Sequence, residues 1–168
     1  MPADREFVMV RPAVPADAGV VASIWFSGWR DGHVGNVPES VVAVRTEVSF
    51  GVRAGERVGD TTVAVVDGVV VGFVMVVGDE VEQVYVGAAH RGAGVAGVLL
   101  AEAERLVAVG GYSRAWLAVV AGNSRARRFY ARCGWVDEGL FEHHAAGGVV
   151  VSAHRYVKQV GGANASRP

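Results

Sequence analysis

The stretch EVEQVYVGAAHRGAGVAGVLL, residues 80–100, constrains the fold most, because the period of its apolar residues changes partway along. Residues 81–86 are rich in β-forming side chains, whereas apolar residues recur at helical spacing from Val95 onward. The glycine-containing turn at 91–96 therefore connects the end of a strand to the start of a helix.

The turn has the composition of an anion-binding site. Gly92 and Gly94 lack the Cβ atoms that would obstruct a ligand, and the first N–H groups of a helix have no partner within it. The positive end of the helix dipole favours an anion there. Arg91 adds a guanidinium cation, whose parallel N–H groups can donate to two phosphate oxygens. We therefore predict that the turn binds phosphate. The alternative is that the glycines only make the start of the helix flexible and that Arg91 is an ordinary surface residue.

Two other phosphate-binding motifs fit less well. Gly92, Gly94 and Gly97 have the spacing of a dinucleotide-binding fingerprint. A dinucleotide-binding fold would place the fingerprint in its first βα unit. In this chain, however, the motif follows a first half whose pattern predicts antiparallel strands. No Gly-Lys-Ser or Gly-Lys-Thr is present, so a P-loop is excluded.

Length and composition indicate one cytoplasmic domain. The 168 residues fit a single domain over 1–160, with a disordered tail expected over 161–168. Sixteen basic and 17 acidic residues argue against a nucleic-acid partner held by bulk charge. Cys133 is the single cysteine, and the opening MPADREFVMV has no export signal. The apolar runs, such as 69–77, are too short to cross a membrane.

The remaining patterns predict seven strands and four helices. The strands are expected over 7–11, 61–66, 69–77, 81–86, 115–120, 135–142 and 148–157, and the helices from Pro15 onward and over 38–50, 94–110 and 123–133. Asp67-Gly68 suits a type I′ turn between the second and third strands. The Gly- and Arg-rich segment 51–59 is expected to be a loop.

Two further groups of side chains are candidates for function. Trp25, Trp29 and His33 crowd the end of the first helix, where they fit a substrate wall and a packed helix end equally well. In the helix over 123–133, the phenol of Tyr130 could point into a cleft, although packing is the commoner role of such a tyrosine. No spacing of His and Cys residues predicts a metal site.

With both segments considered together, the chain resembles the GNAT superfamily of acyl-CoA-dependent N-acetyltransferases over nearly its whole length. Its pyrophosphate signature is matched by Arg91, Gly94 and Ala96, and its later signature by Asn123, Ala126, Phe129-Tyr130 and Gly134-Trp135. The order of the expected elements also agrees. Ala88 stands where the family often has proline, which leaves the turn glycines intact.

The resemblance implies the GNAT fold and acetyl-CoA (coenzyme A) as cofactor. This fold is an α/β (α+β) domain whose central mixed, mostly antiparallel sheet has about seven strands, is splayed at the fourth, and is flanked by about four helices. The implied cofactor-binding residues are Val84, Tyr85 and Val86 along the pantetheine arm, Arg91, Gly92, Ala93, Gly94, Val95 and Ala96 at the pyrophosphate, and Asn123 and Arg127 on the later helix.

The resemblance also implies a direct attack of an amine on the thioester. Tyr130 matches the position that commonly protonates the departing sulfur, and Glu80 and Glu82 are the candidate bases. Glu82 is preferred because it is nearer the expected thioester position; the alternative is that both are solvated carboxylates. The substrate wall is expected to comprise Trp25, Trp29, His33 and Gln83.

The expected function is acetyl transfer from acetyl-CoA to a primary amine of a small molecule. Two alternatives stay open, namely acetylation of a protein N-terminus, a ribosomal protein or another macromolecule, and a non-catalytic acyl-CoA-binding module. We expect neither a nucleic-acid nor a membrane partner. A homodimer is left open.

Overall fold

The computed structural model describes residues 7–145 and 149–161, so most of the expected tail lies outside the described residues. The strands are β1 (Met9–Pro12), β2 (Thr61–Val66), β3 (Val69–Val77), β4 (Glu80–Val86), β5 (Arg114–Val120), β6 (Val136–Ala145) and β7 (Val149–Gln159). The helices are α1 (Ala18–His33), α2 (Glu39–Val44), α3 (Glu47–Glu56), α4 (Val95–Val109) and α5 (Ser124–Arg132), with 3₁₀ turns η1 (Pro15–Asp17), η2 (Val58–Asp60) and η3 (Ala88–His90). Within these ranges no helix is long and apolar enough to cross a membrane.

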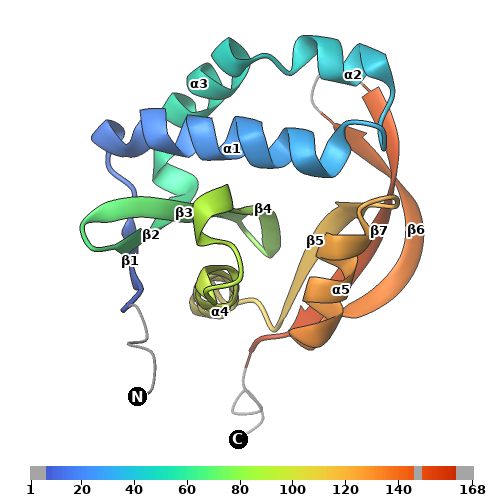
Figure 1. Ribbon diagram of the computed structural model, residues 1–168. Coiled ribbons are helices and arrows are strands. Elements are labelled where there is room, and N and C mark those ends of the chain that lie inside the picture. The colour runs from blue at the N-terminus through green and yellow to red at the C-terminus, as the bar shows by residue number, and fades with distance from the viewer. Residues whose placement is uncertain (1–6, 146–148, 162–168) are drawn as a thin grey trace, which may run out of the picture.

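The strands form one sheet in the order β1-β2-β3-β4-β5-β7-β6 (Figure 1). Every neighbouring pair is antiparallel except β4 and β5, which run parallel and pair only at Glu80 and Trp116. Beyond that contact the two strands separate. The structure therefore confirms a mixed, mostly antiparallel sheet of seven strands that is splayed at the fourth.

Helices cover both faces of the sheet, and each face has its own apolar core. On one side α1, α2 and α3 pack over β2 and β3, with Trp25, Phe50 and Phe73 fully buried and in edge-to-face contact around Trp25 (Figure 1). On the other side α4 contributes Leu99 and Leu100, both buried, to a cluster against which α5 also packs. Burial of these apolar surfaces is the main favourable term in folding.

Several local predictions are confirmed. Asp67 and Gly68 have φ angles of 49° and 78°, as a type I′ turn requires. The first helix follows the turn at Pro15, and the helices expected over 94–110 and 123–133 are α4 and α5. These features depend mainly on local conformational preferences, so the sequence alone could predict them.

The prediction for residues 38–59 is wrong in two respects. The chain forms two helices, α2 and α3, instead of one, and most of the expected loop is the second half of α3. Thr46 interrupts the helix because its backbone is extended and its hydroxyl accepts a hydrogen bond from the Ser49 N–H at 3.2 Å, which starts a new helix. The glycines at 51 and 55 suggest a loop, but burial of Phe50 and Ala54 outweighs their low helix propensity.

We expect Leu99→Ala to lower the free energy of unfolding by about 2–5 kcal/mol, because it opens a cavity between α4 and the sheet. Urea denaturation measures this change. The neighbouring Val98 is 38% exposed, so Val98→Ala is the matched control and should change stability by only about 0.5 kcal/mol. Equal effects of the two substitutions would contradict the packing described here.

Candidate active site

The turn between β4 and α4 has the geometry of an anion cradle. Gly92 and Gly94 have φ angles of 82° and 84°, which favour glycine because other residues are strained there. Gly94 is the N-cap of α4 and no side chain caps this end. The first helical bond runs from the Val98 N–H to the Gly94 carbonyl at 3.2 Å, so the three preceding N–H groups, at 95–97, have no partner within the helix.

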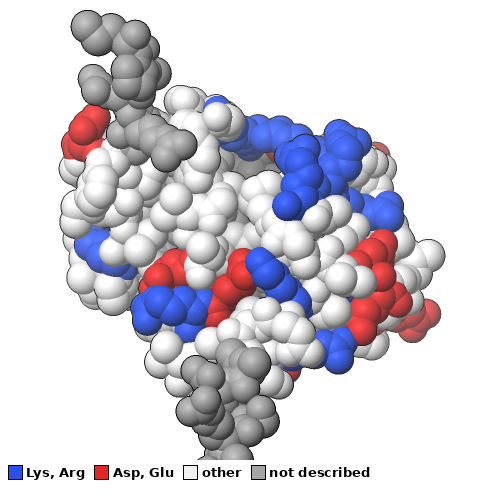
Figure 2. All heavy atoms as spheres, turned by 90° about the horizontal axis from the view of Figure 1, so that it is seen from below, with Lys and Arg blue, Asp and Glu red and all other residues white. Residues whose placement is uncertain are grey.

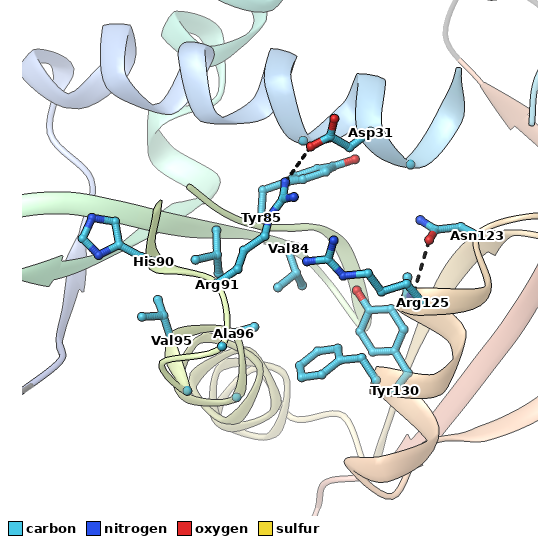
Figure 3. Close-up of a pocket in the computed structure, with 18 of the residues that line it drawn as sticks. Asp31, Val84, Tyr85, His90, Arg91, Val95, Ala96, Asn123, Arg125 and Tyr130 are labelled. Atoms are coloured by element: carbon cyan, nitrogen blue, oxygen red, sulfur yellow. Dashed lines mark hydrogen bonds and ion pairs between the residues drawn. The ribbon is translucent and has the colours of Figure 1, made fainter. Parts of the chain in front are cut away.

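A cavity of about 600 Å³ lies over this turn. Of the residues expected to bind the cofactor, Val84, Tyr85, Val86, Arg91, Gly92, Gly94, Val95, Ala96 and Asn123 line it, whereas Ala93 and Arg127 do not. Arg91 and Arg125 reach into it from opposite sides (Figure 3). Arg91 forms an ion pair with Asp31 of α1 at 2.8 Å, which holds its guanidinium between the turn and α1.

Arg127 is committed to a structural role, which corrects the sequence-based assignment. Its guanidinium donates to the Tyr156 hydroxyl at 3.3 Å and to the Ala121 carbonyl at 3.3 Å. The cavity is instead lined by Arg125 and Arg132, seven residues apart and therefore on one face of α5. The helical period could have identified them. Figure 2 shows basic side chains gathered on the side where α5 lies, with charges of both signs elsewhere on that face.

Two glycines of α1 let the helix approach the cavity closely. A Cβ at Gly28 would lie 2.4 Å from the Tyr85 ring, and one at Gly32 would lie 2.7 Å from the Asn123 side-chain nitrogen. Asn123 also caps α5, because its oxygen accepts from the Ala126 N–H at 3.2 Å. Sequence reasoning missed these glycines, although their spacing of four residues on one helix face was a usable signal.

A bulge in β4 sets the direction of its carboxylates. The pairing of β3 with β4 shifts register between Met75 and Val76, so that Glu82 has no partner on β3. In a regular strand Glu80 and Glu82 would face away from Gln83, because side chains alternate. The extra residue brings all three into one cavity beneath α1.

This second cavity has a volume of about 580 Å³. All four residues expected to form the substrate wall line it: Trp25, Trp29, His33 and Gln83. Trp25 is also a core residue, whereas His33 stacks on Trp29 with ring centroids 4.7 Å apart, and burial lowers the His33 pKa. These residues therefore pack together at the end of α1 and also line a cavity. Three arginines also line the cavity, at positions 45, 53 and 57, and the sequence patterns do not single them out.

The two candidate bases have different electrostatic environments. Burial, with repulsion from Glu82 and Asp79, raises the pKa of Glu80 to about 7. Glu82 instead forms an ion pair with Arg57, which also binds Asp60 at 3.0 Å. Glu80 is therefore poised to exchange a proton near neutral pH, whereas Glu82 is engaged by a cation.

Tyr130 lies at the boundary between the two cavities. The cavities share five lining residues, namely Val84, Tyr85, Asn123, Ala126 and Tyr130. Burial raises the pKa of Tyr130, so its hydroxyl keeps its proton at neutral pH. The ring packs against Trp135 and Tyr156, with centroids 6.3 and 6.1 Å away.

Histidines near the second cavity do not assemble a metal site. His143 and His144 line that cavity, and His154 lies 2.9 Å from a carboxylate oxygen of Asp137. Within residues 7–145 and 149–161, no group of three or more His, Cys, Asp or Glu side chains could hold a metal ion.

The chain belongs to the acetyltransferase (GNAT) family, whose sequence profile matches residues 24–135, two thirds of the 168-residue chain. A comparison with curated proteins found no match.

Solved structures share the fold. A GCN5-related N-acetyltransferase from Rhodopseudomonas palustris is 24% identical, with a TM-score of 0.71 over 90% of this chain and 94% of that one. A phosphinothricin acetyltransferase from Sinorhizobium meliloti, in complex with acetyl-CoA, is 18% identical, with a TM-score of 0.70 over 96% and 92%. The PaiA N-acetyltransferase from Thermoplasma acidophilum, in complex with coenzyme A, is 16% identical, with a TM-score of 0.69 over 91% and 99%.

The raised pKa of Glu80 predicts a pH-dependent stability. The folded chain binds this proton more tightly than the unfolded chain, so between pH 4.5 and about 7 unfolding becomes easier as the pH rises. Glu80→Gln should therefore raise the urea midpoint at about pH 8 and match the wild type at about pH 4.

Glu82→Gln is the matched control for that experiment. It removes the ion pair with Arg57, so it should lower the urea midpoint at about pH 8. A Glu80→Gln variant that is less stable than the wild type at about pH 8 would contradict the electrostatic environment described for this carboxylate.

Proposed function

We propose that this protein transfers an acetyl group from acetyl-CoA to a primary amine of a small molecule. The single observation that carries the proposal is that the cavity over the anion cradle meets the cavity containing Glu80 at Tyr130. A donor on one side and an acceptor on the other would then have a general base and a general acid within the same site.

The residues present fit coenzyme A. The glycine turn supplies backbone N–H donors for a pyrophosphate, and Arg91, Arg125 and Arg132 supply cations for its phosphates. Beyond Glu80, the edge of β4 that faces β5 has no strand partner, which leaves it able to pair with an extended arm. The coenzyme-bound structures from T. acidophilum and S. meliloti support the same assignment. When bound, acetyl-CoA supplies the acetyl group as an activated thioester.

Glu80 is our preferred general base, which replaces the sequence-based preference for Glu82. A primary ammonium must lose a proton before its nitrogen can attack a carbonyl carbon. A carboxylate whose pKa is about 7 is a better acceptor near neutral pH than one paired with an arginine, and Glu80 accepts that proton directly or through a water.

Tyr130 is the proposed general acid. Transfer would form the carbon–nitrogen bond and break the carbon–sulfur bond; the nitrogen would lose a second proton, and the departing sulfur would take one up. The Tyr130 hydroxyl is protonated at neutral pH and borders both cavities, so it is placed to donate its proton to the sulfur.

The dimensions of the second cavity favour a small acceptor. Its volume of about 580 Å³ lies within the range of about 300–1,000 Å³ typical of small-molecule sites. It is walled by the aromatic end of α1 and by strands β4, β5, β6 and β7. A macromolecular acceptor would have to insert a side chain or terminus into this space, so we rank it second.

We expect acetyl-CoA to stabilise the fold, by about 2.7 kcal/mol at roughly 100 Kd, and Arg91→Ala combined with Arg125→Ala to weaken this effect. Thermal denaturation with and without acetyl-CoA measures it. Arg105→Ala is the control, because Arg105 is exposed on α4 and pairs with Glu102. Finding no shift in the wild type would exclude the cofactor assignment.

We expect Tyr130→Phe to lower turnover by about 10² or more while stabilisation by acetyl-CoA is retained, because only a hydroxyl is removed. Glu80→Gln should lower kcat/KM by about 10² to 10⁴, and Glu82→Gln less. Thiol release from acetyl-CoA over a panel of amines provides the assay.

Turnover of Tyr130→Phe within about twofold of the wild type from about pH 6 to 9, with chemistry rate-limiting, would exclude the acid role. Stabilisation by acetyl-CoA without transfer to any small amine or peptide would favour a non-catalytic binding module. Transfer to peptides alone would favour a macromolecular acceptor.

A further inference from the structure

Two of the three arginines that line the second cavity have no ion-pair partner in the described part of the chain. Of its three lining arginines, Arg57 is neutralised by Glu82 and Asp60. Arg45 and Arg53 form no ion pair with any residue in the described ranges. Two arginines therefore border the cavity without an ion-pair partner in the described part of the chain, although Glu56 and Glu80 also line the cavity.

Arg45 is the more unusual of the two. It follows directly after α2, is only 9% exposed, and lines the cavity. Its Nε is fully buried, and no described atom accepts a hydrogen bond from it. A buried N–H group without an acceptor costs free energy, which a bound ligand that accepts a hydrogen bond from it would offset. A group that is costly to folding and faces a cavity has the properties of a binding residue.

Arg53 is oriented by aromatic rings instead of by a carboxylate. Its guanidinium carbon lies 4.4 Å from the Trp25 ring centroid and 5.5 Å from that of Phe50. Stacking of this kind occupies the face of a guanidinium and leaves its N–H groups available at the edge. Burial and the nearby charges of Arg45 and Arg57 lower its pKa to about 10, so it stays charged at neutral pH.

We propose that Arg45 and Arg53 form a subsite that binds a carboxylate, and that the acceptor is a small primary amine carrying this carboxylate. The inference rests on the proposed function and specifies its substrate class. The carboxylate would pair with the two arginine side chains while the amine is directed to Glu80 in the same cavity. A guanidinium fork matches a carboxylate in a bidentate geometry, and desolvation of both partners makes such a pair specific.

The other carboxylate in this part of the cavity does not replace the ligand. Glu56 also lines the cavity, at the end of α3, but it forms no ion pair with either arginine in the described part of the chain. A phosphonate would present the same chemistry to the arginines, so the experiment includes it as a separate arm.

The test is calorimetric binding to the full chain saturated with coenzyme A, which separates recognition from catalysis. The ligands are matched pairs of primary amines, each a carboxylate and its carboxamide on the same skeleton, spanning α-, β- and γ-amino acids, with an aminoalkylphosphonate series. We expect at least one carboxylate to bind about tenfold or more tightly than its carboxamide, equivalent to about 1.4 kcal/mol.

Arg45→Gln and Arg53→Gln should each reduce that preference to about twofold or less, whereas Arg105→Gln should retain it. No preference in any pair, or one retained in both variants, would overturn the proposal. Preference for phosphonates alone would overturn the carboxylate assignment.

Stability supplies an independent readout. Arg45→Met should leave the melting temperature unchanged or raise it, because it removes a buried cation without a partner in the protein. A clear fall would show a structural role for Arg45 and overturn the proposal.

Measurement of thiol release with the same amines then separates the proposed acetyl-transfer activity from the proposed carboxylate subsite. Selective carboxylate binding without transfer would exclude the proposed activity alone, and equal transfer to carboxylates and carboxamides would exclude the subsite alone.

Discussion

The separation of β4 from β5 is the constraint on which the rest of the structure depends. The two strands pair only at Glu80 and Trp116, after which β4 continues with β3 and β5 continues with β7. Backbone groups along the separated edges lack a partner in the sheet, and buried backbone groups require one. An extended ligand can satisfy them, and both cavities adjoin this opening, where Val84 and Tyr130 line each of them.

Stability and function are divided between different parts of the molecule. The two apolar clusters, one beneath α1, α2 and α3 and one beneath α4 and α5, supply the favourable burial. The unfavourable groups are concentrated in the cavities, where Glu80 is partly desolvated and Arg45 is buried without a partner. Natural proteins commonly depart from good packing and pairing at functional sites, and in this chain the departures coincide with the opening in the sheet.

The features predicted correctly from the sequence are those determined by a few consecutive residues. The turn at Asp67-Gly68, the glycine turn before α4 and the helices expected over 94–110 and 123–133 each follow from local conformational preference. The prediction for residues 51–59 is wrong because tertiary burial of Ala54 outweighs two glycines. Arg127 is expected at the cofactor from the family resemblance, but its orientation depends on which face of α5 meets Tyr156.

The sequence by itself determined the family signatures, the anion cradle and the presence of a tyrosine and two carboxylates near one site. Only the tertiary structure decided how those groups differ. The bulge at Glu82 brings Gln83 into the cavity of both carboxylates, burial raises the pKa of Glu80 while Glu82 pairs with Arg57, and Arg45 and Arg53 line the same cavity. The physical reason is that pKa and charge balance depend on burial and on neighbours distant in sequence, which local patterns do not specify.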